Sequence, residues 1–172
     1  LRGLREKGVE AASLTSASNS KARAAAVMND LLGAGDQEED GNVLEGGGGG
    51  KGVDQRVGPQ TKLLYVTPEM LAKSARLAAA LETLASRGLV SLLAVDEAHC
   101  VSTWGHDFRP AYLKIGEFRK KRLKGVPCLA LTATATKEVC SDIMNQLGMA
   151  KGSRVLKTSF DRPEIHLSVR YK

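Results

Sequence analysis

The stretch that most constrains the fold is an apolar run that ends abruptly in two carboxylates. Residues 89–95 read Leu-Val-Ser-Leu-Leu-Ala-Val, and Asp96 and Glu97 follow directly. Such a run is typical of a strand that is buried on both faces of a parallel sheet. Burying a carboxylate is costly unless it is paired or faces a metal, and α/β sheets bind ligands at the carboxyl ends of their strands. The sequence therefore predicts an α/β fold with a ligand site at this strand end.

The two carboxylates also indicate which chemistry this site would perform. An aspartate in this position can hold Mg²⁺ through its water ligands, and a neighbouring glutamate can orient or deprotonate a water that attacks a phosphate. Asp96 and Glu97 therefore indicate the metal-binding and hydrolytic half of a nucleoside-triphosphate site.

The residues that follow resemble a known family of enzymes. Asp96-Glu-Ala-His99 resembles motif II of superfamily-2 helicases, and Cys100-Val-Ser-Thr-Trp-Gly-His-Asp-Phe-Arg-Pro-Ala-Tyr112 resembles the aromatic-rich loop of RecQ-family DNA helicases. Thr103 and Ala111 depart from the family pattern, which usually has Gln and often an acidic residue at these positions. The resemblance implies a RecA-like (P-loop NTPase) parallel sheet flanked by helices, incomplete at its N-terminus.

The same resemblance implies an ATP-dependent 3′-to-5′ DNA helicase that acts in DNA repair and recombination and uses ATP and Mg²⁺. Asp96 would hold the metal, Glu97 would activate water, and both would contact the nucleotide. Thr132 and Thr134 lie in Thr132-Ala-Thr-Ala-Thr136, which resembles helicase motif III. Their hydroxyls suit a strand end that couples to motif II, and His99 would hydrogen-bond across to them.

The aromatic-rich loop supplies the expected DNA-sensing residues, which are Trp104, His106, Phe108 and Arg109. Either aromatic residue alone would more often belong to a core. In a Gly- and charge-rich loop beside a hydrolytic motif, both suit base stacking, worth about 1–3 kcal/mol per base. In the RecQ family this loop is understood to sense single-stranded DNA and to relay its presence to ATP hydrolysis. Arg109 could bind a phosphate or pair with Asp107, and both alternatives stay open.

Hydrophobic periodicity and capping residues predict the remaining elements. Strands are expected at 9–14, 62–67, 126–131 and 154–157, and helices at 1–7, 18–32, 68–88, 112–124 and 136–148.

The chain divides into four parts on composition and motifs. We expect residues 1–32 to begin a partial first helicase domain around motif Ia, 33–60 to be a Gly-rich acidic disordered insertion, 61–158 to complete that domain, and 159–172 to lead toward a second one. The first residue is Leu1, and no phosphate-gripping glycine loop precedes it, so we expect a fragment that is inactive alone.

Several other functions are disfavoured by the residues present. The run Gly46–Gly50 ends in Lys51-Gly52, without the Ser or Thr of a phosphate-binding loop. His99, Cys100 and His106 lack an evident fourth ligand, so no zinc is expected.

The expected partners are single-stranded DNA, duplex junctions and ATP. No apolar run approaches the roughly 18 residues that span a bilayer, so no membrane partner is expected. A formal net charge of +6 permits nucleic acid as a partner, and the DNA role suggests a nuclear protein. Two alternatives stay open: another superfamily-2 enzyme such as a DEAH-type RNA helicase, and a non-catalytic DNA-binding or interaction module.

Overall fold

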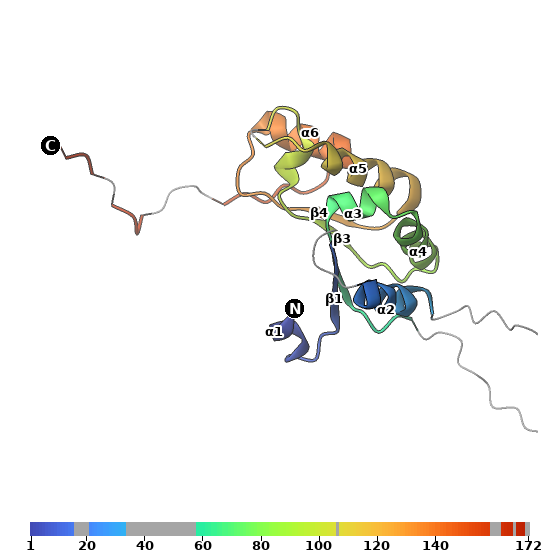
Figure 1. Cartoon of the computed structure of the whole chain (residues 1–172). Helices are drawn as coiled ribbons and strands as arrows, with labels where there is room; N and C mark the ends of the chain where they lie inside the picture. Colours follow the sequence, from blue (N-terminus) through green and yellow to red (C-terminus); the bar gives the residue numbers. More distant parts are fainter. Residues whose placement is uncertain (16–20, 34–57, 106, 159–162, 167, 171–172) are drawn as a thin grey trace, which may run out of the picture.

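The computed structural model describes residues 1–15, 21–33, 58–105, 107–158, 163–166 and 168–170. Short strands alternate with helices along these segments (Figure 1). The strands are β1 (Ala11–Leu14), β2 (Leu63–Val66), β3 (Leu93–Val95) and β4 (Cys128–Ala130). The helices are α1 (Arg2–Arg5), α2 (Lys21–Leu32), α3 (Pro68–Lys73), α4 (Ala75–Ser86), α5 (Pro110–Arg122), α6 (Lys137–Leu147) and the 3₁₀ turn η1 (Ala98–Val101).

The strands form two parallel pairs. β1 pairs with β2, with Ala11 opposite Leu63, and β3 pairs with β4, with Leu93 opposite Cys128. Parallel neighbours need a long crossover connection, and a helix lies between the two strands of each pair. The predicted α/β class with parallel strands is therefore confirmed.

Side-chain caps fix where the helices begin. Thr67 and Thr136 accept hydrogen bonds from the backbone N–H groups of Met70 and Val139, three residues later in each case. Gly148 has a left-handed conformation (φ 63°) and ends α6, as its place after the apolar pattern predicted.

The core of the second half lies between β3, η1, α5 and α6. One cluster joins the end of β3 to these helices through buried side chains: Val95, Ala98, Val101, Ile115, Val139, Ile143 and Leu147. Gly116 on α5 lies so close to α6 that a Cβ atom there would be 2.2 Å from the Gln146 carbonyl oxygen. Ala98 and Val101 anchor η1 in this core, and the same turn carries His99.

The prediction of one helix over 68–88 is wrong in detail. The chain breaks at Ser74, whose backbone is extended (φ −96°, ψ 94°) and whose hydroxyl accepts from the Leu77 N–H. Ser74 thus ends α3 and caps α4. The apolar spacing hides this break because residues from both helices still face the core.

The prediction that the central strand is buried on both faces is also wrong. β3 covers only Leu93–Val95; Val95 is buried, but Ala94 is exposed and Leu92 is 51% exposed. Leu129 on β4 is likewise 44% exposed. Among the described residues helices cover only one face of these strands, so the apolar run alternates between core and solvent.

Two further expectations concern the segments outside regular structure. Residues 154–157 form no strand in the structure. Most of the expected insertion, residues 34–57, lies outside the described residues, as do 159–162, 167 and 171–172 of the expected link. The described flanks of the insertion are joined, because the Asp30 carboxylate accepts the backbone N–H groups of Gln60 (2.8 Å) and Thr61 (2.9 Å).

Candidate ATPase and DNA-coupling site

Pairing of β3 with β4 brings two distant segments of the sequence together. The Leu131 N–H donates to the Val95 carbonyl (2.9 Å), and the Ala98 N–H donates to the Leu131 carbonyl (2.8 Å). The carboxylate stretch that starts at Asp96 and the threonine stretch that starts at Thr132 therefore leave the sheet side by side.

Asp96 and Glu97 lie where the sequence placed them, just past the carboxyl end of β3. Both side chains are exposed rather than buried. Glu97 has a left-handed backbone (φ 48°, ψ 41°), the one positive φ outside glycine among the described residues. A non-glycine residue in this region carries strain of about 1–3 kcal/mol and often marks a functional turn. The turn directs both carboxylates away from the core.

This pair fits the magnesium ion that the sequence implies. Mg²⁺ prefers oxygen ligands and is usually held by one or two carboxylates together with waters and substrate phosphates. Exposed carboxylates at a strand end leave the remaining positions to those ligands. Asp96 would hold the ion, which when bound would neutralise phosphate charge.

His99 connects the carboxylate stretch to the threonine stretch. Its ring is buried, and its Nδ1 lies 2.9 Å from Oγ1 of Thr132 and 3.4 Å from Oε2 of Glu97. The Thr132 hydroxyl also donates to the Thr134 carbonyl (3.1 Å). A hydroxyl has one hydrogen, and the Thr132 hydroxyl gives it to the Thr134 carbonyl. His99 must then donate to Thr132 Oγ1, which requires the tautomer with the proton on Nδ1. The structure thus brings together Glu97, His99, Thr132 and Thr134.

The aromatic loop, which we define as residues 102–109, connects η1 to α5. Trp104 is 79% exposed and Phe108 is 38% exposed, so neither is a core residue. Ser102 is fully buried, and its hydroxyl accepts the Trp104 N–H (3.2 Å). Gly105 permits a close approach to η1, because a Cβ atom there would lie 2.7 Å from the His99 carbonyl oxygen. The loop backbone next to Trp104 is therefore held against η1, while the Trp104 indole itself is exposed to solvent.

Arg109 pairs with Asp107, which decides between the two alternatives left open by the sequence for the ligand-free chain. An Arg109 guanidinium nitrogen lies 2.5 Å from Asp107 Oδ2, and this bond lowers the pKa of the Asp107 carboxyl and raises that of Arg109. The Cys100 thiol donates to the same oxygen (3.7 Å). Burial raises the pKa of the Cys100 thiol, which favours its protonated, donating form.

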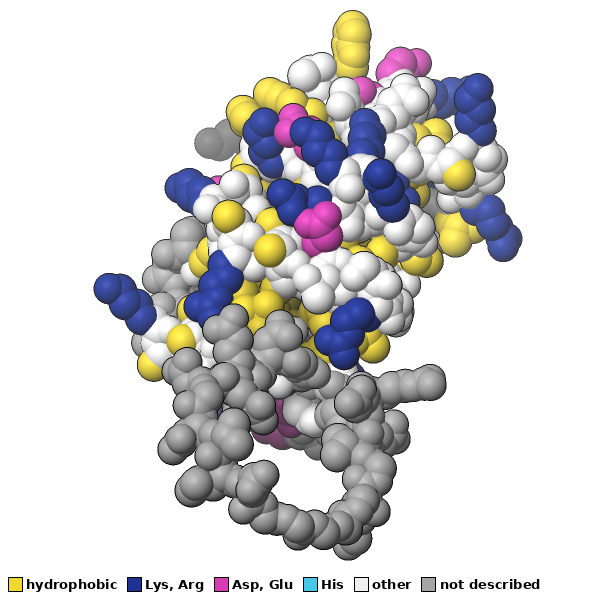
Figure 2. Space-filling model, turned by 90° about the vertical axis from the view of Figure 1, so that its right-hand side faces the viewer, with side chains coloured by type: hydrophobic (Ala, Val, Ile, Leu, Met, Phe, Trp, Pro, Cys, Tyr) yellow, Lys and Arg dark blue, Asp and Glu magenta, His cyan; other side chains and the backbone are white. Residues whose placement is uncertain are grey.

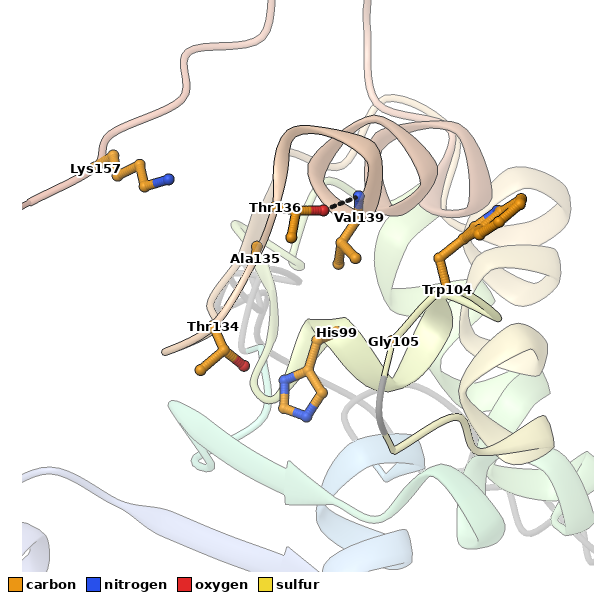
Figure 3. A pocket seen from close by; sticks show the side chains of 8 residues that line it. All are labelled: His99, Trp104, Gly105, Thr134, Ala135, Thr136, Val139 and Lys157. Carbon is orange, nitrogen blue, oxygen red and sulfur yellow. Dashed lines mark hydrogen bonds between the residues drawn. The ribbon is translucent and has the colours of Figure 1, made fainter. Parts of the chain in front are cut away.

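A pocket of about 450 Å³ separates the aromatic loop from the threonine stretch (Figure 3). His99 lies at its base, Thr134 and Thr136 lie along one side, and Lys157 faces it from the segment after α6. Trp104 and Gly105 line the pocket from the aromatic loop. Most of the Trp104 indole is nevertheless exposed to solvent (79%).

The sequence did not reveal which side chains support the aromatic loop from within the protein. Ser102, Cys100 and Asp107 support the loop, although only Trp104, His106, Phe108 and Arg109 were predicted to act there. His106 lies outside the described residues. Ligand atoms of His99, Cys100 and Asp107 lie within 4.8 Å of one another, a grouping that the sequence could not show. The expectation of no zinc stays a prediction.

A basic cluster at the end of α5 consists of Arg119, Lys120, Lys121, Arg122 and Lys124, and two of its members contact other parts of the protein. Figure 2 shows Lys and Arg side chains spread over the described part of one face, with acidic side chains between them. Arg119 points inward and donates to the carbonyls of Leu147 and Gly148, both at 2.8 Å, whereas Arg122 pairs with Glu82 on α4. Arg119 therefore clamps α5 to the end of α6.

The helices of the described segments are too short or too polar to cross a lipid bilayer.

Comparison with known proteins identifies the family. A family model described as DEAD/DEAH box helicase matches residues 22–143. The mouse (Mus musculus) ATP-dependent DNA helicase Q5 is 50% identical over 118 residues, which are 69% of this chain and 12% of that protein. The Xenopus laevis RecQ-like DNA helicase BLM is 48% identical over 111 residues, 64% of this chain and 8% of that protein.

A solved structure gives less information. The helicase domain of Hef from Pyrococcus furiosus is 26% identical and aligns with 52% of this chain and 17% of that chain, with a TM-score of 0.31, too low to support the fold. The assignment of the fold rests instead on the family match and on the two parallel strand pairs. The chain belongs to the DEAD/DEAH box helicase family, with the α/β architecture of part of its first, RecA-like domain, and the relatives described here are of RecQ type.

Proposed function

We propose that this chain is the part of a RecQ-type 3′-to-5′ DNA helicase in which bound single-stranded DNA is coupled to hydrolysis of Mg²⁺-ATP. The observation that carries the proposal is the position of His99. It contacts both Glu97 and Thr132, and it lies on the same 3₁₀ turn that leads into the aromatic loop. The carboxylates and the exposed indole are therefore connected through one short, buried element.

Each residue has a defined task in this proposal. Asp96 holds the metal ion and Glu97 orients the attacking water. Trp104 and Phe108 stack on bases, and Arg109 contacts a phosphate. Thr132 and Thr134 sense the state of the carboxylates through His99.

The chain spans 12% and 8% of the length of the mouse and Xenopus relatives, so the activity of the whole protein is itself part of the proposal. We propose action in DNA repair and recombination and a nuclear location, on the strength of the DNA helicase relatives. We further propose that the chain by itself does not hydrolyse ATP or unwind DNA, since it offers no glycine loop of the phosphate-binding kind.

A binding experiment on the chain tests the DNA part. We expect a dye-labelled single-stranded oligonucleotide to bind, as followed by fluorescence anisotropy at low salt. Trp104→Ala should weaken binding about 5- to 150-fold, the equivalent of about 1–3 kcal/mol of lost stacking. Tyr65→Ala is the matched control, because Tyr65 is an exposed aromatic residue on β2 (52% exposed) outside the aromatic loop. Equal affinity of wild type and Trp104→Ala would contradict the proposal.

The hydrolysis part needs the full-length protein. There, Trp104→Ala should abolish stimulation of the ATPase by DNA while leaving nucleotide binding intact, because the indole lies outside the carboxylate site. Unchanged stimulation would refute the role given to the loop. For the chain alone, ATP turnover at helicase-like rates would refute its proposed inactivity.

A further inference from the structure

The carboxylate of Asp107 lies between an exposed cation and two buried groups. Its Oδ2 atom is 2.5 Å from the Arg109 guanidinium and 3.7 Å from the Cys100 thiol. A ligand atom of His99 also lies within 4.8 Å of Asp107 and of Cys100. Asp107 is thus the one acidic side chain of the aromatic loop, and it faces the η1 turn that carries His99.

The Asp107–Arg109 pair is easily exchanged. Both side chains are about half exposed, with 43% and 55% of their surface accessible. Exposed ion pairs contribute about 0–1 kcal/mol, so little free energy opposes their separation. A DNA phosphate offers Arg109 the same bidentate geometry as a carboxylate and adds the contacts of the neighbouring aromatic residues. Bound DNA can therefore take Arg109 away from Asp107.

Loss of Arg109 leaves Asp107 without a cationic partner. The Cys100 thiol supplies one weak donor, because sulfur forms weaker hydrogen bonds than nitrogen. Among the described residues His99 is the other titratable group near Asp107, and closing from at most 4.8 Å to hydrogen-bond distance needs a shift of about 2 Å. A His99 ring drawn toward Asp107 leaves Thr132 and changes the contacts of Glu97.

We propose that Asp107 is a positioning residue that exchanges Arg109 for His99 when a phosphate binds Arg109. DNA binding thereby breaks the contact between His99 and Thr132. The proposal rests on the proposed function in that the phosphate belongs to DNA. The exchange itself depends only on removal of the Arg109 charge from Asp107. It can therefore be tested with and without DNA.

The test follows the ring nitrogens of His99 by NMR in the ¹⁵N-labelled chain. The chain has three histidines, and the loss of signals in His99→Gln assigns the relevant ring. Arg109→Gln should shift the His99 signals without any DNA, because it removes the partner of Asp107. The double variant Arg109→Gln/Asp107→Asn should restore them. Lys114→Gln breaks the comparably exposed Lys114–Glu117 pair and should leave His99 unchanged.

The second arm adds single-stranded DNA. In the wild type the His99 signals should shift on binding. In Asp107→Asn they should not, although DNA binds with equal or up to about fivefold higher affinity, because Arg109 no longer has a competing partner. In the full-length protein, the same variant should lower DNA-stimulated ATP hydrolysis without weakening DNA binding.

The outcomes separate the two proposals. Wild-type chain that fails to bind DNA would contradict the proposed function, while the Arg109→Gln arm would still decide the exchange. His99 signals that are unmoved in Arg109→Gln, or that shift equally in the double variant, would overturn the exchange. Weaker DNA binding by Asp107→Asn would overturn it as well. Since Arg109 and Asp107 are surface residues, circular dichroism should show an unchanged fold.

Discussion

The Nδ1 atom of His99 lies 2.9 Å from the Oγ1 atom of Thr132, 33 residues later in the chain. This contact joins the turn after β3 to the segment after β4. Because the His99 ring is buried and Thr132 also contacts the Thr134 backbone, the contact is held on both sides. Since the same Nδ1 atom lies 3.4 Å from Glu97 Oε2, His99 connects this carboxylate to the threonine stretch.

Removing the hydroxyl at position 132 should disconnect His99 from the threonine stretch. We expect Thr132→Val to shift the NMR signals of the His99 ring and to cost about 1 kcal/mol in the free energy of unfolding, the typical net value of a hydrogen bond. Thr132→Ser keeps the hydroxyl and is the control. His99 signals that are identical in all three proteins would show that the contact has no role in solution.

The left-handed backbone of Glu97 should lower the free energy of unfolding, while its carboxylate should be needed for ATP hydrolysis. Glycine adopts the left-handed conformation without penalty, so Glu97→Gly should raise the free energy of unfolding by about 1 kcal/mol. Glu97→Gln retains the strain and should leave stability unchanged in chemical denaturation. Both variants remove the carboxylate and should abolish ATP hydrolysis in the full-length protein. A glycine variant that is less stable than the glutamine variant would show that the turn is not strained.

Arg119 and Arg122 should differ sharply although they are neighbours in one basic cluster. Arg119→Met removes donors to the carbonyls of Leu147, Gly148 and Val126, and it should cost about 2 kcal/mol in urea denaturation. Arg122→Met removes only an exposed pair with Glu82 and should cost less than about 1 kcal/mol. Equal losses of unfolding free energy in the two variants would contradict a stabilising role for the inward hydrogen bonds of Arg119.

The Asp107–Arg109 pair should respond to acid in a defined direction. The pKa of the Asp107 carboxyl is lowered from its ordinary value of 3.8, first of all by the bond from Arg109. The folded pKa therefore lies below the unfolded one, so the contribution of the pair is present above about pH 4 and is lost as the pH falls through the lowered pKa.

The chain has one tryptophan, Trp104, so its emission reports on the loop as the pH falls. We expect a change below pH 3.8 in the wild type that is absent in Asp107→Asn. A transition centred above pH 3.8 would contradict the lowered pKa.

The sequence by itself determined the α/β class, most of the helices and strands, and the family. Local chemistry is sufficient for these features: apolar runs define strands, Thr136 caps a helix, and the Asp96–Tyr112 stretch carries rare residues at fixed spacing. It also predicted that Asp96 and Glu97 follow the end of a strand, and the structure places them directly after β3.

Only the tertiary structure decided which residues meet. The approach of His99 to Thr132, the sharing of one Asp107 oxygen by Cys100 and Arg109, and the inward turn of Arg119 all join groups through the packing of η1, α5 and α6. The exposed faces of Ala94 and Leu129 depend on which helices cover a strand, and apolar character alone cannot specify that. Contacts between distant residues follow from how the elements pack together, and one-dimensional patterns do not contain that information.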